Sequence, residues 1–224
     1  MKEFLLPILT IAWKDVLLEL RTKDMVTSVI MFALLVMTIF GFAFDPSPQI
    51  MATVAPGILW VAFTFAGILV FNRTFALEEE NGSLEGLLLS PVSRDVLYFG
   101  KLLGIFLFMM VMELLLLPFF AVVYNVQVLD VKLFLIAALA TLGFSGVGAL
   151  ISAMVVNTRS REIMLPVLLL PVTLPVIIAA VAATRVVLEG ASWSGVGHWW
   201  GLVIAFDVIF LIFASFVFGS ILEE

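Results

Sequence analysis

Two acidic residues could do ion or proton chemistry in an apolar setting. Glu113 and Asp207 each lie inside a long apolar stretch, and a charge within such a stretch is costly when the stretch spans a membrane. Both are therefore candidate intramembrane polar or transport residues. The structural alternative is that Glu113 accepts a hydrogen bond between helices, and that Asp207 lies near enough to a helix end to reach water.

The single histidine, His198, stands directly before Trp199 and Trp200, with Trp193 close by. Histidine can ligate haem iron and aromatic rings can stack on a porphyrin, so these residues are candidates for a haem or interface contact. Tryptophan is also enriched where a membrane meets water. We favour an aromatic belt at that interface.

Other chemistry is missing from the sequence. One histidine and no cysteine exclude a His-rich or Cys-rich metal cluster, and we expect no metal site. The sequence has no G-x-x-x-x-G-K-[ST] phosphate loop and no readable nucleophile–His–acid set. We therefore expect no catalytic residue and no ATPase site of its own, and a membrane-embedded enzyme would require Glu113, Asp207 and His198 to converge.

Composition places these residues in lipid. The chain has 224 residues, of which 63% are hydrophobic and 12% charged, with a mean hydropathy of +1.25. A soluble domain has roughly 45–50% apolar and about 25% charged residues. The net charge is −6 without any basic tract, which gives no reason to expect a nucleic-acid partner.

Six stretches have the length of about 20 apolar residues that a spanning helix needs. We expect an all-α integral membrane protein with a single transmembrane domain over residues 1–224. The predicted spans are about 25–44, 50–71, 102–124, 133–156, 163–184 and 199–222, with no Lys or Arg inside any of them.

The basic residues predict the orientation, because Lys and Arg gather in cytoplasmic loops. Two predicted outer segments carry only Lys132 and Arg185. The opposite set of segments carries Lys2, Lys14, Arg21, Lys23, Arg73, Arg94, Lys101, Arg159 and Arg161. Both termini, the loop over 72–101 and the loop over 157–162 are therefore predicted to be cytoplasmic.

Residues 4–23 carry too many charges to span a membrane. Leu9, Trp13, Val16 and Leu20 recur at helical spacing, which predicts an interfacial amphipathic helix with Trp13 as its anchor. Lys14, Arg21 and Thr22 fall largely on the other face. The alternative is a cytoplasmic extension of the first span.

Two later spans have unusual composition. The run "TLGFSGVGALISA" in the fourth span is rich in small residues, which predicts close packing on another helix or subunit. Pro166, Pro171 and Pro175 lie in the fifth span. Each removes a helical N–H, so we expect a broken or strongly bent helix there.

The stretch 78–95, "EEENGSLEGLLLSPVSRD", interrupts the apolar chain. Gly82 can end one helix, Ser83 can cap the next with Glu85 in its first turn, and Pro91 ends it. These signals predict a short cytoplasmic helix at about 83–90 with Leu84, Leu87 and Leu88 on one face. Such a helix could rest on lipid or dock in a partner's groove. The acidic lead-in favours a protein partner, because anionic lipid would repel it.

Four segments carry a family resemblance. They are "APGILWVAF" (55–63), "ENGSLEGLLLSPVSRDVLYFGK" (80–101), "TLGFSGVGAL" (141–150) and "LPVLLLPVTLPVIIAA" (165–180). Together they resemble the haem exporter protein B (CcmB) family, the membrane permease of the cytochrome c maturation ABC transporter. The resemblance extends from the amphipathic N-terminus to the sixth span.

The resemblance implies an ABC exporter permease in the bacterial inner membrane, with a coupling helix between the second and third spans. The implied partners are a CcmA-like subunit that binds ATP, CcmC-like and CcmD-like membrane proteins, and a CcmE-like periplasmic haem chaperone. Haem would be the handled or transported ligand. The implied ATPase-coupling residues are Glu79, Glu80, Gly82, Leu84, Glu85, Leu87, Leu88 and Pro91. Alternatives are an ABC exporter for a lipid, glycan or drug, and a non-transporting scaffold for haem-handling partners.

Overall fold

Seven helices make up the computed structural model, which describes residues 2–44, 48–74 and 93–221. Within these residues there is no β-strand. The helices are α1 (Lys2–Thr22), α2 (Asp24–Ala43), α3 (Pro48–Thr74), α6 (Arg94–Tyr124), α7 (Val131–Val155), α8 (Arg161–Leu188) and α9 (Trp193–Ile221).

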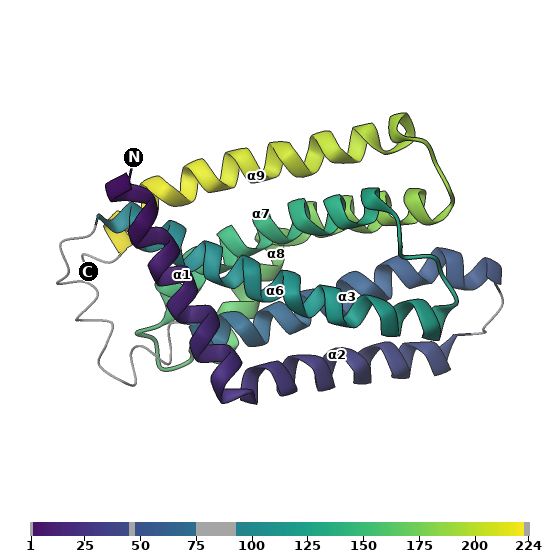
Figure 1. The fold of residues 1–224 in the computed structure, drawn as a ribbon, viewed down its shortest axis with the longest axis horizontal. Helices are drawn as coiled ribbons and strands as arrows, with labels where there is room; N and C mark the ends of the chain where they lie inside the picture. Colours follow the sequence, from purple (N-terminus) through teal and green to yellow (C-terminus); the bar gives the residue numbers. More distant parts are fainter. Residues whose placement is uncertain (1, 45–47, 75–92, 222–224) are drawn as a thin grey trace.

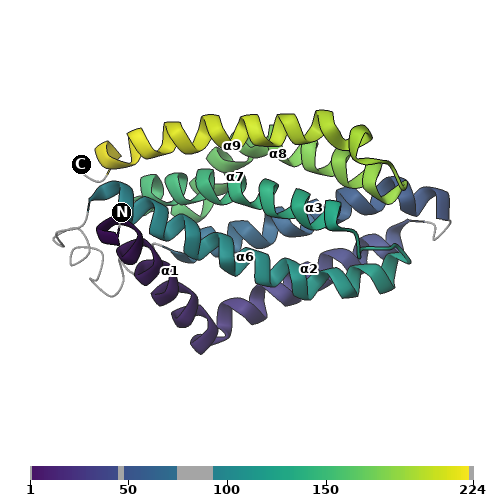
Figure 2. The ribbon, with the colours of Figure 1, turned by 45° about the horizontal axis from the view of Figure 1, so that its top comes forward.

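Six of these helices, α2, α3 and α6 to α9, are long and apolar enough to cross a membrane. They lie side by side as a bundle (Figures 1 and 2). The prediction of an all-α membrane protein with six spans is therefore confirmed.

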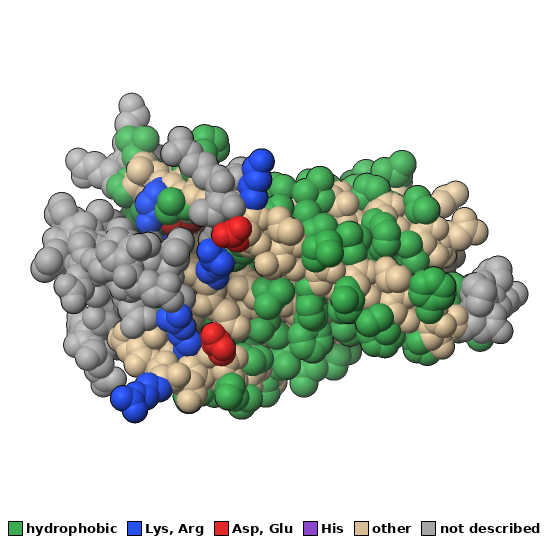
Figure 3. Space-filling view, turned by 90° about the horizontal axis from the view of Figure 1, so that it is seen from below, with side chains coloured by type: hydrophobic (Ala, Val, Ile, Leu, Met, Phe, Trp, Pro, Cys, Tyr) green, Lys and Arg blue, Asp and Glu red, His purple; other side chains and the backbone are tan. Residues whose placement is uncertain are grey.

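Most of the described charged residues lie at one end of the bundle. The start of α1, the end of α3, the start of α6 and the end of α9 meet at this end (Figure 1), which we call the N-terminal end. On the face seen in Figure 3, the basic and acidic side chains lie toward that end, and hydrophobic side chains cover much of the rest of the described surface. Asp24 illustrates this, since its carboxylate lies 4.0 Å from the guanidinium of Arg73 across α2 and α3.

Helix α1 crosses the bundle obliquely and packs on α6 (Figures 1 and 2). A sharp turn at Lys23, whose φ is 58°, separates α1 from α2. The side of α1 that faces α6 buries Ile8, Ile11 and Ala12. Leu9 and Trp13 on the predicted apolar face are 55% and 66% exposed, so that face points away from the bundle, as an interfacial helix requires.

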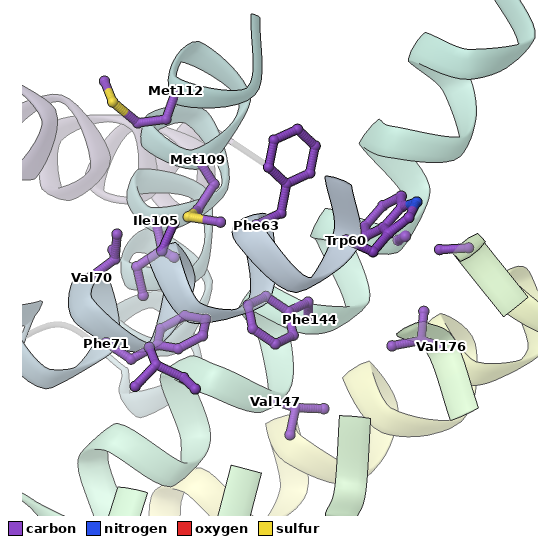
Figure 4. Packing of buried hydrophobic residues seen from close by; sticks show 14 of the residues in the cluster. Trp60, Phe63, Val70, Phe71, Ile105, Met109, Met112, Phe144, Val147 and Val176 are labelled. Carbon is purple, nitrogen blue, oxygen red and sulfur yellow. The ribbon is translucent and has the colours of Figure 1, made fainter. Parts of the chain in front are cut away.

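The small residues of α7 allow close packing, as predicted. A Cβ atom on Gly148 would run into the ring of Phe71 on α3, and one on Gly146 would lie 2.6 Å from Leu211 on α9. Phe71 in turn packs on Phe144, with ring centroids 5.1 Å apart (Figure 4). Helix α7 therefore forms the centre of the bundle, in contact with α3, α6, α8 and α9.

Helix α8 was predicted to be broken or strongly bent, and it is not broken. It runs without interruption from Arg161 to Leu188 with Pro166, Pro171 and Pro175 inside it. A proline removes one helical hydrogen bond, and neighbouring side chains can compensate in a membrane helix. The buried hydroxyl of Thr173 donates to the Leu169 carbonyl at 2.9 Å within this proline-rich stretch.

Candidate functional site

The predicted coupling residues lie outside the described residues. Glu79, Glu80, Gly82, Leu84, Glu85, Leu87, Leu88 and Pro91 all fall in the interval 75–92, so the helix at about 83–90 stays a prediction. The structure does describe the flanking helices, since α3 ends at Thr74 and α6 begins at Arg94. The candidate site is therefore built from these flanks, and above all from the start of α6.

A buried ion pair joins α1 to α6 close to that start. Lys101 Nζ lies 3.0 Å from Asp15 Oδ2, and the lysine side chain is only 1% exposed. Lys14 Nζ lies 3.3 Å from the other oxygen of Asp15. Lys101 lies directly before the predicted span of 102–124. Helix α6 begins at Arg94, and Asp15 supplies the opposite charge that a buried ammonium needs.

Two glycines of α6 make room for this contact. A Cβ atom on Gly100 would lie 2.9 Å from Ile11 Cβ, and one on Gly104 would lie 3.3 Å from Asp15 Cβ. Glycines four residues apart form a shallow groove into which another helix fits. The sequence reasoning missed this site, although the run "GKLLG" at 100–104 carries both the glycine spacing and the buried lysine.

A cavity of about 40 Å³ lies beside the ion pair. Its lining residues come from α1, α2, α3 and α6, and they include Asp15, Met25, Val70, Lys101 and Phe108. The N-terminal end of the bundle is thus less densely packed where these four helices meet.

Glu113 lies in the middle of α6 and is 2% exposed. Its Oε1 accepts a hydrogen bond of 2.5 Å from the hydroxyl of Thr141 on α7. The structural alternative of a hydrogen bond between helices is therefore observed for this residue. Its second oxygen, Oε2, is buried and accepts no hydrogen bond from the described residues.

Asp207 is buried on α9, with only 4% of its surface exposed. The expectation that it reaches water near a helix end is wrong, because its carboxylate lies against Gly143 of α7. Neither carboxylate oxygen accepts a hydrogen bond from the described residues. Gly143 is two residues from Thr141, about 3 Å along a helix axis, so Glu113 and Asp207 contact α7 at nearly the same depth from opposite neighbours.

The aromatic residues lie at the opposite end of the bundle. The His198 ring packs edge-on to Trp199 at 5.3 Å, and Trp193 lies 5.8 Å from Trp200. Lys132 Nζ donates to the Ala191 carbonyl at 2.8 Å, which ties the start of α7 to the turn before α9. This arrangement suits an aromatic belt at a membrane surface.

The three candidate residues for enzyme chemistry do not converge. Glu113 contacts Thr141, Asp207 contacts Gly143, and His198 packs on Trp199. No group of three or more His, Cys, Asp or Glu side chains that could hold a metal occurs within residues 2–44, 48–74 and 93–221. The polar residues within the bundle therefore act as separate sites.

The fold defines a multi-pass helical membrane protein of the permease type, with an additional helix packed across its third span. The profile of the family described as CcmB protein matches residues 7–224. The chain belongs to the CcmB family.

Curated relatives are similar along most of their length. Heme exporter protein B of Pseudomonas aeruginosa is 30% identical over 199 residues, covering 88% of this chain and 89% of the relative. The protein of the same name from Escherichia coli (strain K12) is 33% identical over 179 residues, covering 76% and 80%. The Bradyrhizobium diazoefficiens protein is 26% identical over 215 residues, covering 94% and 95%.

Proposed function

We propose that this protein is the membrane permease subunit of an ABC transporter that serves haem delivery or export in c-type cytochrome biogenesis. The observation that carries the proposal is the family match over residues 7–224, together with similarity to relatives named heme exporter protein B that extends over most of their length. The partner that binds ATP is a separate CcmA-like subunit, because this sequence has no phosphate loop.

Segment 78–95 is the docking element for that subunit. The helix predicted at about 83–90 would present Leu84, Leu87 and Leu88 to an apolar groove on the partner. Helix α6 begins at Arg94, within the last two residues of this segment. A displacement of the segment is therefore passed on to α6.

Helix α1 moves with α6 in this proposal. The Asp15–Lys101 ion pair at 3.0 Å and the close fit of Ile11 and Asp15 against Gly100 and Gly104 hold the two helices together. The cavity beside the pair leaves room for their joint displacement. ATP hydrolysis in the partner thus rearranges the membrane complex, and this loads or releases the CcmE-like chaperone beside CcmC-like and CcmD-like partners.

The protein lies in the inner membrane with its N-terminal end in the cytoplasm. Nine of the eleven Lys and Arg residues belong to segments assigned to that side, which is the distribution that sets the orientation of membrane proteins. The aromatic cluster with His198 then faces the periplasm. A single cysteine placed at Ser194 and one placed at Ser93 would test this, since a membrane-impermeant maleimide should label only the first in intact spheroplasts.

Docking is tested by two substitutions, Leu87→Asp and Glu85→Arg. Removing one leucine from an apolar groove forfeits about 1.5–3 kcal/mol, so Leu87→Asp should weaken binding of the ATP-binding subunit about 10- to 100-fold in a pull-down. The matched control is Leu129→Asp, which makes the same change at a 90% exposed position at the opposite end of the bundle. Full binding and full ATPase coupling in both test variants would refute the docking role.

The haem role is tested in a strain that lacks this protein. We expect c-type cytochromes to be lost, with a changed amount of haem on the periplasmic chaperone. Restoration by the natural chain, but not by Leu87→Asp, would connect the docking element to haem handling. Normal cytochromes together with a defect in lipid, glycan or drug export would instead support an exporter of the same architecture for another substrate.

A further inference from the structure

A small cavity of about 10 Å³ lies inside the bundle where α3, α6, α7 and α8 meet. Most of its wall is apolar, and Figure 4 shows Trp60, Phe63, Phe144 and Val176 around this region. Its polar wall consists of Glu113, Thr64 and Thr141. This cavity plays no part in the coupling proposed above, which concerns the N-terminal end of the bundle.

The carboxyl group of Glu113 is only half satisfied in this wall. Oε1 accepts the Thr141 hydroxyl at 2.5 Å, whereas Oε2 is buried and has no hydrogen-bond partner among the described residues. Leaving a buried polar atom unpaired costs about 1–3 kcal/mol. Such atoms are few in native proteins and are commonly satisfied by ordered water.

The nearby N–H of Trp60 does not supply the missing hydrogen bond. Trp60 Nε1 donates to Thr184 Oγ1 at 2.9 Å, across α3 and α8. The lining residues include no Lys, Arg or His, so no cation of this cavity wall pairs with the carboxyl group. The hydrogen-bond partner that Oε2 lacks must therefore enter the cavity itself.

The size of the cavity selects the ligand. To hold one water molecule, a cavity needs roughly 10–15 Å³ of space for the centre of a water-sized sphere. That water also needs two to four polar partners. The observed volume of about 10 Å³ is at this limit and is too small for an organic ligand. The hydroxyl groups of Thr64 and Thr141 line the same space as Glu113, which provides the required partners.

We propose that this cavity binds one structural water molecule, which forms a hydrogen bond with Glu113 Oε2 and bridges it to the Thr64 hydroxyl. The water joins α3 to the α6–α7 pair that the Glu113–Thr141 hydrogen bond already connects. The result is a polar centre shared by three helices inside an otherwise apolar bundle. Any motion that separates α3 from α6 has to break it.

A double-mutant cycle tests the bridge in the full chain, purified in lipid nanodiscs. Thr64→Val removes one partner of the water, and Glu113→Leu removes the other and fills the cavity. We expect Thr64→Val to lower the midpoint of thermal unfolding in the natural background, and to lose at least half of that effect when Glu113→Leu is present. Additive effects of the two substitutions would overturn the proposal.

Thr173→Val is the matched control. Thr173 is also fully buried, but its hydroxyl donates to the Leu169 carbonyl of its own helix and does not line the cavity. Its effect should be the same with and without Glu113→Leu. Coupling of Thr173 to Glu113 as strong as that of Thr64 would show a general loosening of the bundle and would overturn the bridge.

Two further measurements test the proposal on the unmodified protein, so their expected results do not depend on the folding of a variant. A high-resolution cryo-EM map of the unmodified transporter complex should show one density peak within hydrogen-bond distance of Glu113 Oε2 and Thr64 Oγ1. An empty cavity would overturn the proposal. The unfolding midpoint should also be equal in sodium, potassium and choline chloride at matched ionic strength, whereas a shift specific to sodium that Glu113→Leu abolishes would indicate a metal ion instead of water.

Discussion

Asp15→Asn should loosen helix α1 from α6. The substitution removes the charge that faces Lys101 Nζ at 3.0 Å, and that lysine is 1% exposed. Removing one partner of a buried pair costs about 3–5 kcal/mol. The Asp15 side chain is 17% exposed, so water reaches it and the lower figure applies. The free energy of unfolding should therefore fall by about 3 kcal/mol, or about 6–12 °C in the unfolding midpoint at 2–4 °C per kcal/mol.

The reciprocal substitution should cost less. Lys101→Met keeps the apolar stem that packs in the interface, and Asp15 keeps Lys14 Nζ at 3.3 Å. We expect a loss of about 1 kcal/mol, in line with the small effect of replacing a buried charge by an apolar residue of similar volume. Asp15→Asn therefore measures the cost of leaving the Lys101 charge buried without its partner. Lys101→Met measures the net contribution of the ion pair.

The matched control is an exposed ion pair of equal length. Arg185 Nε also lies 3.0 Å from its partner, Glu189 Oε1, but both side chains are about half exposed, at 50% and 51%. Exposed pairs contribute roughly 0–1 kcal/mol. Glu189→Gln should therefore change the unfolding midpoint little, although it removes the same charge over the same distance.

The assay combines thermal unfolding with the reactivity of a single thiol. The natural chain has no cysteine, so Ala12→Cys, at a position that is 2% exposed on the α1 side facing α6, would be the only thiol. If the loss of about 3 kcal/mol in Asp15→Asn makes detachment of α1 from α6 easier by the same amount, the cysteine becomes accessible more often. Its labelling should then accelerate about 100-fold. Equal labelling rates in the Asp15→Asn and Glu189→Gln backgrounds would refute the role of the buried pair.

Three other substitutions test the packing of the bundle. Gly148→Leu should destabilise the α3–α7 contact by about 3 kcal/mol, because a side chain there would run into Phe71; an unfolding midpoint equal to the natural one would contradict this. Tyr124→Phe should lower the free energy of unfolding by about 1 kcal/mol, since the buried hydroxyl donates to a main-chain carbonyl of α2, and chemical unfolding in mixed micelles would measure it. Lys132→Met should speed hydrogen exchange in the turn at Ala191, whose carbonyl accepts from Lys132 Nζ; unchanged exchange would show that the ammonium does not order the turn.

The class of fold was predictable because it depends on local composition. Runs of about 20 apolar residues identify spanning helices without any knowledge of packing, and six such helices are present. The small residues of α7 also indicated close helix packing correctly, because Gly146 and Gly148 meet side chains of α9 and α3. The family could be recognised for the same reason, since its segments are contiguous in the chain.

The polar sites were less predictable, because each depends on residues that are distant in sequence. Asp207 was expected near water, yet packing of α9 on α7 places it against Gly143. The three prolines predicted a broken or strongly bent helix, and α8 is unbroken. Propensity describes an isolated helix, whereas in a bundle the neighbouring helices determine whether a weakened helix stays continuous.

The sequence by itself therefore determined that this protein is a six-span helical membrane protein of the CcmB family, and it identified Glu113 as a polar residue within a span. Only the tertiary structure decided that Thr141 is the hydrogen-bond partner of Glu113 and that Asp15 neutralises Lys101. The physical reason is that hydrophobicity is a property of each segment. A buried charge or carboxyl group is instead stabilised by a partner on another helix, and the partner is known only when the helices are packed.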